Sequence, residues 1–134
     1  MPVRPLVCLS RMVLLVKNTK ILVVDDEIKA CQLLSRFLTK RGFSVQIASN
    51  GRDALIKAVE FKPNCILLDV RMPQGGSELL SSLKLKLPES IVFMMSAFIE
   101  VDQHQDYLGR GAHACINKPV DLVLLLNKIR QALK

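Results

Sequence analysis

The sequence is poor in aromatic residues, with no tryptophan, one tyrosine and five phenylalanines among 134 residues. Proteins that bind single-stranded nucleic acids stack bases on aromatic side chains, so no such surface is expected here. The net charge of +7 does not indicate nucleic acid either. Four of these charges come from Arg4, Arg11, Lys17 and Lys20, and no basic run follows them. We therefore expect no direct contact with nucleic acid.

Clustered cysteines and long apolar runs are also missing. The segment Leu6–Val16 is interrupted by Ser10 and Arg11, is too short to cross a bilayer and lacks the small-residue cleavage site of a signal peptide. The absence of any C-x-x-C pair excludes an ordinary zinc site and a disulfide framework, which favours a reducing cytoplasm without membrane contact. The cysteines, all widely spaced, are Cys8, Cys31, Cys65 and Cys115.

Hydrophobic residues make up half of the chain and charged residues 23%, which is typical of a globular domain. Short apolar segments at 21–24, 43–48, 65–68, 91–95 and 112–117 predict strands. Amphipathic segments at 28–41, 54–61, 79–87, 100–110 and from 122 onward predict helices between and after them. This alternation predicts one doubly wound α/β domain over residues 20–134, a (βα)5 unit with a central five-stranded parallel sheet. Residues 1–19 are expected to form a flexible N-terminal extension.

Two helices can be oriented from their apolar positions. The first predicted helix repeats apolar residues at spacings of three and four, beginning at Ile28. Before the second predicted helix, the Asn50-Gly51 pair is a turn signal. In the last helix Leu122, Leu126 and Ile129 share one face, and Leu124 lies near the opposite side. An outward Leu124 is consistent with a docking or homodimer surface on the last helix, although a single exposed leucine is ordinary.

The first strand ends in acids, in the stretch KILVVDDE from Lys20 to Glu27. Asp25 and Asp26 could simply stop the strand and cap the next helix. Parallel strands, however, bring their carboxyl ends to one edge of the sheet, where such folds build their sites. That edge should also carry Asp69 after the third strand, Ser96 after the fourth and Lys118 after the fifth.

Three carboxylates at one edge repel each other unless a cation lies among them. Mg²⁺ suits such a group, because it binds a few carboxylates and keeps waters that an incoming phosphate can replace. Lys118 could neutralise a phosphoryl group and Ser96 could donate a hydrogen bond to it. The constellation therefore has the positioning and charge-stabilising parts that phosphoryl transfer requires.

From Lys20 to Lys134 the sequence resembles a receiver domain of the two-component response regulators, in the CheY-like superfamily, with flavodoxin-like topology. The matching motifs are VVDDE at Val23–Glu27, LLDVRMP at Leu67–Pro73, the Met-Ser-Ala of Met95–Ala97 and the Lys-Pro of Lys118–Pro119.

The resemblance implies that Asp69 is the phospho-acceptor and takes its phosphoryl group from a sensor histidine kinase or a phosphotransfer protein. It implies that Asp25, Asp26, Asp69 and the backbone carbonyl of Arg71 hold Mg²⁺, for which Mn²⁺ could substitute.

The resemblance further implies that Ser96 binds the phosphoryl oxygens and that Lys118 pairs with the phosphate, with Lys118–Pro119 as a cis peptide. Such a domain is a signalling switch acting on a downstream protein. It is not an enzyme in the turnover sense, although its own residues assist its phosphorylation and dephosphorylation.

Two positions depart from the family pattern. A glycine usually lies eight residues beyond the phospho-acceptor, whereas Gly76 lies seven beyond Asp69, so the loop is one residue shorter and Gly75-Gly76 supply its unusual dihedral angles. Three residues before the lysine of the fifth strand the family commonly has an aromatic ring that swings inward, and this chain has Cys115.

Three alternatives stay open on the sequence. A degenerate receiver could act as a constitutive protein-binding module, which Cys115 and the short loop would favour. A phosphohydrolase of another α/β family would be expected to carry a second acid two residues after Asp69, where this chain has Arg71. The chain could also be the receiver part of a longer DNA-binding regulator.

Overall fold

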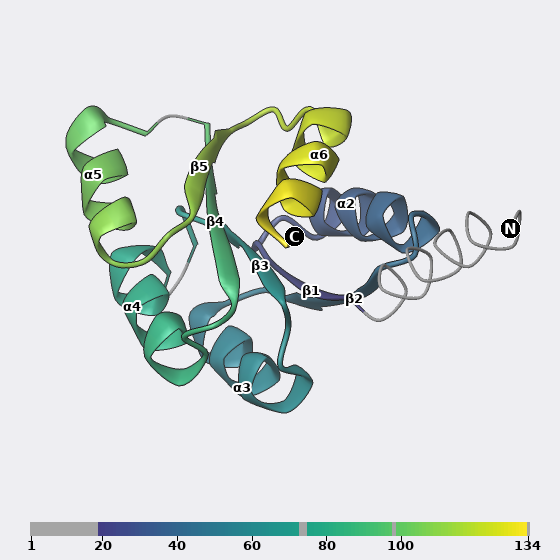
Figure 1. The fold of residues 1–134 in the computed structure, drawn as a ribbon, viewed down its shortest axis with the longest axis horizontal. Coiled ribbons are helices and arrows are strands. Elements are labelled where there is room, and N and C mark those ends of the chain that lie inside the picture. The colour runs from purple at the N-terminus through teal and green to yellow at the C-terminus, as the bar shows by residue number, and fades with distance from the viewer. Residues whose placement is uncertain (1–18, 73–74, 98, 134) are drawn as a thin grey trace, which may run out of the picture.

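The computed structural model describes residues 19–72, 75–97 and 99–133. In this part of the chain five parallel strands form one sheet in the order β2-β1-β3-β4-β5, with helices on both of its faces (Figure 1). The predicted doubly wound α/β architecture is therefore confirmed. In chain order the elements are β1 (Lys20–Val24), α2 (Ile28–Lys40), β2 (Ser44–Ala48), α3 (Gly51–Phe61), β3 (Cys65–Asp69), α4 (Gly76–Lys86), β4 (Ile91–Ser96), α5 (Val101–Gly109), β5 (Ala114–Asn117) and α6 (Leu122–Ala132).

Strand β1 lies inside the sheet, and the strand order changes direction beside it. Val24, its last residue, pairs with Ala48 of β2 on one side and with Leu68 of β3 on the other. The chain thus moves to one side of β1 and then to the other, which leaves a crevice above the carboxyl ends of β1 and β3. Asp25 and Asp69 follow these two strand ends and are placed at that crevice.

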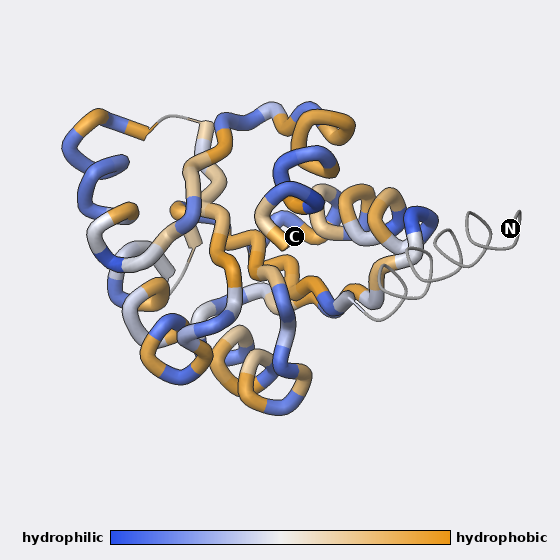
Figure 2. Tube along the Cα trace, viewed as in Figure 1, coloured by the Kyte–Doolittle hydropathy of each residue, from blue (hydrophilic) through white to orange (hydrophobic). Residues whose placement is uncertain are grey.

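Alternate residues of the strands enter two separate cores. Helices α2 and α6 cover one face and pack on Ile21, Val23 and Leu67 among others. Helices α3, α4 and α5 cover the opposite face and pack on Leu22, Val24 and Leu68. Figure 2 shows the strands as hydrophobic and the helices as alternating between hydrophobic and hydrophilic positions. Burial on both faces explains why the strands read as continuous apolar runs.

Local details differ from the sequence predictions. Asn50-Gly51 is not a free turn but the start of α3, because the Asn50 side chain accepts a hydrogen bond from the Asp53 N–H and caps the helix. Ile28, the first residue of the predicted apolar repeat, is 64% exposed. Helix α2 begins at this residue, before the apolar face of the helix reaches the sheet. Strand β5 begins only at Ala114, two residues later than predicted.

Other expectations agree with the structure or lie outside it. Leu124 is 52% exposed, as predicted for the outward side of the last helix, while Leu125 and Leu126 are buried. Among the described residues no helix is both long and apolar enough to cross a membrane. The predicted extension over residues 1–19 lies, apart from Thr19, outside the described residues.

Candidate functional site

Three carboxylates meet at the carboxyl edge of the sheet. Asp25 and Asp26 follow β1 and Asp69 ends β3, and one carboxylate oxygen from each lies within 4.8 Å of the others. Asp25 is only 3% exposed and Asp69 only 5%, whereas Asp26 is exposed. The structure therefore brings together the three acids that the sequence placed at this edge.

Lys118, from the end of β5, lies between two of these acids. Its Nζ donates a hydrogen bond to Asp25 Oδ2 at 2.9 Å and forms an ion pair with Asp69 Oδ1 at 3.3 Å. The following Lys118–Pro119 peptide is cis, as the sequence predicted. The sequence assigned Lys118 to an incoming phosphate, and the structure shows that its ammonium already bridges Asp25 and Asp69.

The charges of the site do not balance. Three carboxylates and one ammonium leave a formal charge of −2, and two of the carboxylates, Asp25 and Asp69, are buried. Burial and the charge of Asp25 raise the pKa of Asp69, and Lys118 offsets only part of that effect. Burial by itself would lower the pKa of Lys118, but its bonds to Asp25 and Asp69 outweigh burial and raise it.

Ser96 and Arg71 complete the predicted set. Ser96 ends β4, is 1% exposed, and its carbonyl accepts a hydrogen bond from the Lys118 N–H at 2.8 Å. The Arg71 N–H lies 3.5 Å from Asp69 Oδ1, so its backbone borders the site, while a metal-binding role for its carbonyl stays a prediction.

The alternative that the acids merely cap the next helix finds no support. The N-cap of α2 is Glu27, which makes no side-chain capping bond, and Asp25 Oδ1 accepts a hydrogen bond from the Glu27 N–H in a local turn. Sequence reasoning missed one neighbour of the acids, Cys31 of α2, because an isolated cysteine in an amphipathic helix gives no signal of a polar contact. Its Sγ donates to the Asp25 carbonyl at 3.2 Å, and burial followed by the charge of Asp25 raises its pKa to about 11, which keeps the thiol protonated.

The donor set fits a small divalent cation. Ligand oxygens on opposite sides of Mg²⁺ lie about 4.2 Å apart, because each Mg–O bond is about 2.1 Å long. The three carboxylate oxygens lie within 4.8 Å of one another, close to that span, so the three acids could share one such ion. A divalent charge would also cancel the formal excess of −2. The acids are hard oxygen ligands, the type that Mg²⁺ and Mn²⁺ accept.

An apolar groove opens directly beside this cluster. It has a volume of about 480 Å³ and runs between α2 and the segment after β5, with Asp25 and Lys118 in its wall. Its apolar lining includes Leu33, which is 59% exposed. The groove is not evident from the sequence, in which its one signal is an apolar Leu33 on the polar side of α2.

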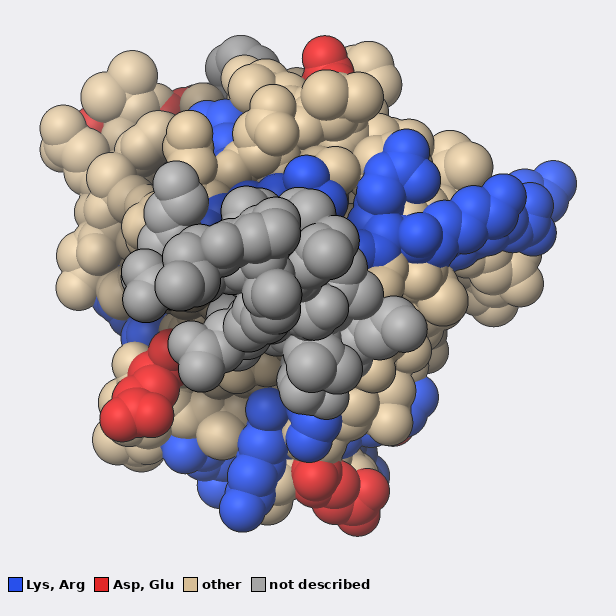
Figure 3. All heavy atoms as spheres, turned by 45° about the vertical axis from the view of Figure 1, so that its right-hand side comes forward, with Lys and Arg blue, Asp and Glu red and all other residues tan. Residues whose placement is uncertain are grey.

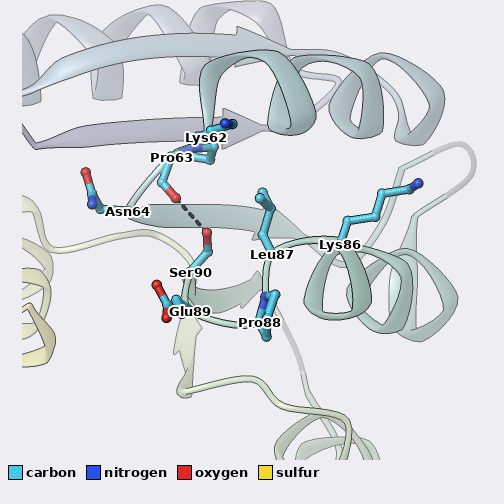
Figure 4. A pocket seen from close by; sticks show the side chains of 8 residues that line it. All are labelled: Lys62, Pro63, Asn64, Lys86, Leu87, Pro88, Glu89 and Ser90. Atoms are coloured by element: carbon cyan, nitrogen blue, oxygen red, sulfur yellow. Dashed lines mark hydrogen bonds between the residues drawn. The ribbon is translucent and has the colours of Figure 1, made fainter.

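A second hollow, of about 300 Å³, lies at the opposite edge of the sheet (Figure 4). It is lined by the residues that precede β3 and β4, including Lys62, Asn64 and Ser90. Inside it the Ser90 hydroxyl donates to the Pro63 carbonyl at 2.6 Å. The acids follow the carboxyl ends of their strands, so this hollow takes no part in their chemistry.

The two departures from the family pattern have visible local consequences. Gly76 has a φ of +76°, and a side chain on Gly75 would come within 3.0 Å of the Met72 carbonyl oxygen. Gly76 therefore supplies the unusual dihedral angle that the sequence predicted at the entry into α4. Gly75 has an ordinary φ of −103°, and Met72 leaves little room for a side chain there. Cys115 is partly buried on β5 and packs against the core under α3, α4 and α5.

Comparisons with known proteins agree with this geometry. The family model of the response regulator receiver domain matches residues 21–130. Sporulation initiation phosphotransferase F of Bacillus subtilis is 35% identical over 119 residues, which cover 87% of this chain and 92% of that protein. Regulatory protein AtoC of Escherichia coli is 34% identical over 116 residues, or 86% of this chain. The chain spans only about a quarter of the length of AtoC and of the similar ZraR regulators.

Solved structures show the same relationship. A two-component response regulator from Clostridium difficile superimposes with a TM-score of 0.83 at 26% identity, over 87% of this chain and 96% of that one. Chemotaxis protein CheY4 of Vibrio cholerae gives a TM-score of 0.81 at 29% identity, over 86% and 98%. Together with the family model, these similarities show that the chain belongs to the receiver domains of two-component response regulators.

Proposed function

We propose that this receiver domain is switched by phosphorylation of Asp69. The observation that carries the proposal is the position of the Asp69 carboxylate, which is buried beside two further acids and within 3.3 Å of the Lys118 ammonium. A raised pKa also makes this carboxylate a stronger base, and so a better nucleophile, than a fully solvated one.

The transfer requires one bond to form and one to break. An Asp69 oxygen forms a P–O bond while the P–N bond to the donor's phosphohistidine breaks, and the imidazole nitrogen keeps the electron pair. We expect Lys118, whose Nζ lies 3.3 Å from Asp69 Oδ1, to pair with the phosphoryl oxygens, and the Ser96 hydroxyl to donate to them. When bound by Asp25, Asp26 and Asp69, Mg²⁺ supplies neutralisation of the phosphoryl charge. We expect no turnover of a separate substrate.

The groove beside the site supports a protein as phosphoryl donor, either a sensor histidine kinase or a phosphotransfer protein in the cytoplasm. It leads to Asp25 and Lys118 along α2. On the outward side of α2, Lys29, Arg36 and Lys40 are exposed around Leu33, and the sequence has no acid between Ile28 and Arg52. Figure 3 shows several Lys and Arg side chains, together with fewer Asp and Glu side chains, on the face turned toward the viewer. We expect the donor to present acidic residues to the outward side of α2.

Intact-mass spectrometry with acetyl phosphate tests the proposal. In the presence of Mg²⁺ the chain should gain the mass of one phosphoryl group. After EDTA is added, the phosphoryl group should be lost more slowly than it was gained in Mg²⁺. Asp69→Asn should gain nothing, whereas Asp53→Asn, which changes an acid of α3 paired with Lys57, should react normally. An unchanged mass in the native chain would show a degenerate receiver, the alternative that Cys115 favours.

A further inference from the structure

Every polar atom of Asp25 has a protein partner. Its N–H donates to the Ala48 carbonyl at 3.0 Å, and its carboxylate oxygens accept from the Glu27 N–H at 3.0 Å and from Lys118 Nζ at 2.9 Å. Its carbonyl accepts from the Cys31 thiol at 3.2 Å. Three of these contacts hold the strand end and the carboxylate, and the fourth holds the peptide group that follows Asp25.

The carbonyl that the thiol contacts belongs to the peptide that joins Asp25 to Asp26. A peptide group is planar, so turning its carbonyl changes the backbone angles on both sides at once. Both residues belong to the group of three carboxylates whose oxygens lie within 4.8 Å of one another. The thiol therefore acts on the relative orientation of two of the three acids.

Cys31 is itself firmly placed. It lies in the first turn of α2, where its N–H donates to the Glu27 carbonyl at 3.1 Å, and it is only 1% exposed in the core beneath α2 and α6. Its side chain thus connects the start of α2 to the end of β1. Without the thiol, the buried Asp25 carbonyl is left unsatisfied unless the peptide turns toward another donor or toward solvent.

We propose that Cys31 is a positioning residue for the metal site, whose thiol holds the Asp25–Asp26 peptide so that both acids can bind one Mg²⁺. Mg²⁺ demands nearly ideal octahedral geometry and tolerates misplaced ligands poorly. Loss of a partner that orients a metal ligand costs about ten- to a hundredfold in affinity, and because a thiol is a weak donor we expect the lower end of that range. The inference deepens the proposed function and rests on the Mg²⁺ site proposed there.

Calorimetric titration with Mg²⁺, at a temperature well below each Tm, tests this role. Cys31→Ala removes the donor, Cys31→Ser keeps one, and Cys65→Ala is the matched control. Cys65 is fully buried in the same core, but it pairs with Ile21, four residues before Asp25, which places it about 13 Å away along the strand. We expect the Kd for Mg²⁺ to rise about tenfold in Cys31→Ala and to stay within about twofold of the native value in the other two variants.

Thermal unfolding separates positioning from packing. Both alanine variants lose the same atoms from the same core, so Tm should fall in both, while only Cys31→Ala should also lose Mg²⁺ affinity. A native Mg²⁺ affinity in Cys31→Ala overturns the inference. An equal loss of affinity in Cys31→Ser and Cys31→Ala also overturns it, because the donor would then not be the cause.

Intact-mass spectrometry with acetyl phosphate keeps the inference apart from the proposed function. Cys31→Ala should need about tenfold more Mg²⁺ to reach half of its maximal rate of mass gain, whereas that maximal rate should stay within about twofold of the native rate, because Asp69 and Lys118 are unchanged. No gain of mass in the native chain overturns the proposed function, while calorimetry still decides the role of Cys31. No binding of Mg²⁺ by the native chain overturns the inference about Cys31.

Discussion

Replacing Asp69 with asparagine removes one negative charge from the acid cluster and keeps the shape of the side chain. We expect the Asp69→Asn variant to be more stable than the native chain at pH 7 without divalent metal. A carboxyl whose folded-state pKa is raised stabilises the fold fully only below its unfolded-state pKa, and this contribution is lost as the pH rises through the folded-state pKa. Once the pH has passed the folded-state pKa, the native chain has lost this contribution, whereas asparagine carries no such penalty.

The magnitude follows from the distances. At an effective dielectric constant of about 20, two carboxylates within 4.8 Å repel by about 3.5 kcal/mol or more, and an ion pair at 3.3 Å gains about 5 kcal/mol. Asp25 and Lys118 therefore nearly cancel each other at Asp69, and solvent screens the exposed Asp26. The remaining contribution is the desolvation of the Asp69 carboxylate, which is 5% exposed, and it costs a few kcal/mol. We expect a net stabilisation of about 2 kcal/mol, or roughly 5–10 °C in Tm.

Thermal unfolding by circular dichroism measures this difference. The gap between the two proteins should shrink as the pH falls through the pKa of Asp69, because a protonated carboxyl is also uncharged. Saturating Mg²⁺ should also narrow the difference in Tm, since Mg²⁺ binding stabilises the native chain more than the variant. Asp53→Asn, at an exposed ion pair, should move Tm little under either condition. A Tm for Asp69→Asn at or below the native value at pH 7 without metal would refute this account of the site.

Three further predictions concern the neighbours of Asp69. Lys118→Met should destabilise the metal-free fold by about 2–4 kcal/mol at pH 7, because it leaves Asp25 and Asp69 unpaired. Because the pKa of Lys118 is raised, the difference in Tm between the native chain and Lys118→Met should fade above about pH 10.5. A difference that stays the same at alkaline pH would contradict this prediction. Ser96→Ala should slow phosphorylation by acetyl phosphate roughly ten- to a hundredfold, as the loss of one donor does, with Mg²⁺ affinity by calorimetry unchanged. Leu33→Asp should slow phosphotransfer from a donor protein at least tenfold while acetyl phosphate reacts at the native rate. Equal slowing of both reactions would place Leu33 in the chemistry and not in docking.

Much of the fold was predictable because burial on both sides leaves continuous apolar strands, and these alternate with amphipathic helices. The boundaries were less secure where a polar side chain acts on the backbone. Asn50 reads as a turn residue but caps α3 through the Asp53 N–H, a choice between two local hydrogen bonds that depends on where α3 packs. Ile28 belongs to the apolar repeat by spacing, yet α2 starts there, before it reaches the sheet.

The sequence by itself determined which side chains would meet, because the carboxyl ends of parallel strands share one edge and Asp25, Asp69 and Lys118 each follow a strand. Only the tertiary structure decided how they pair. Lys118 bridges Asp25 and Asp69, and the Cys31 thiol donates to the Asp25 carbonyl, through contacts between residues far apart in the chain. The same holds for the missing aromatic ring. The sequence shows a cysteine at position 115, but only the packing of α5 and β5 brings Tyr107 and Cys115 into the same core.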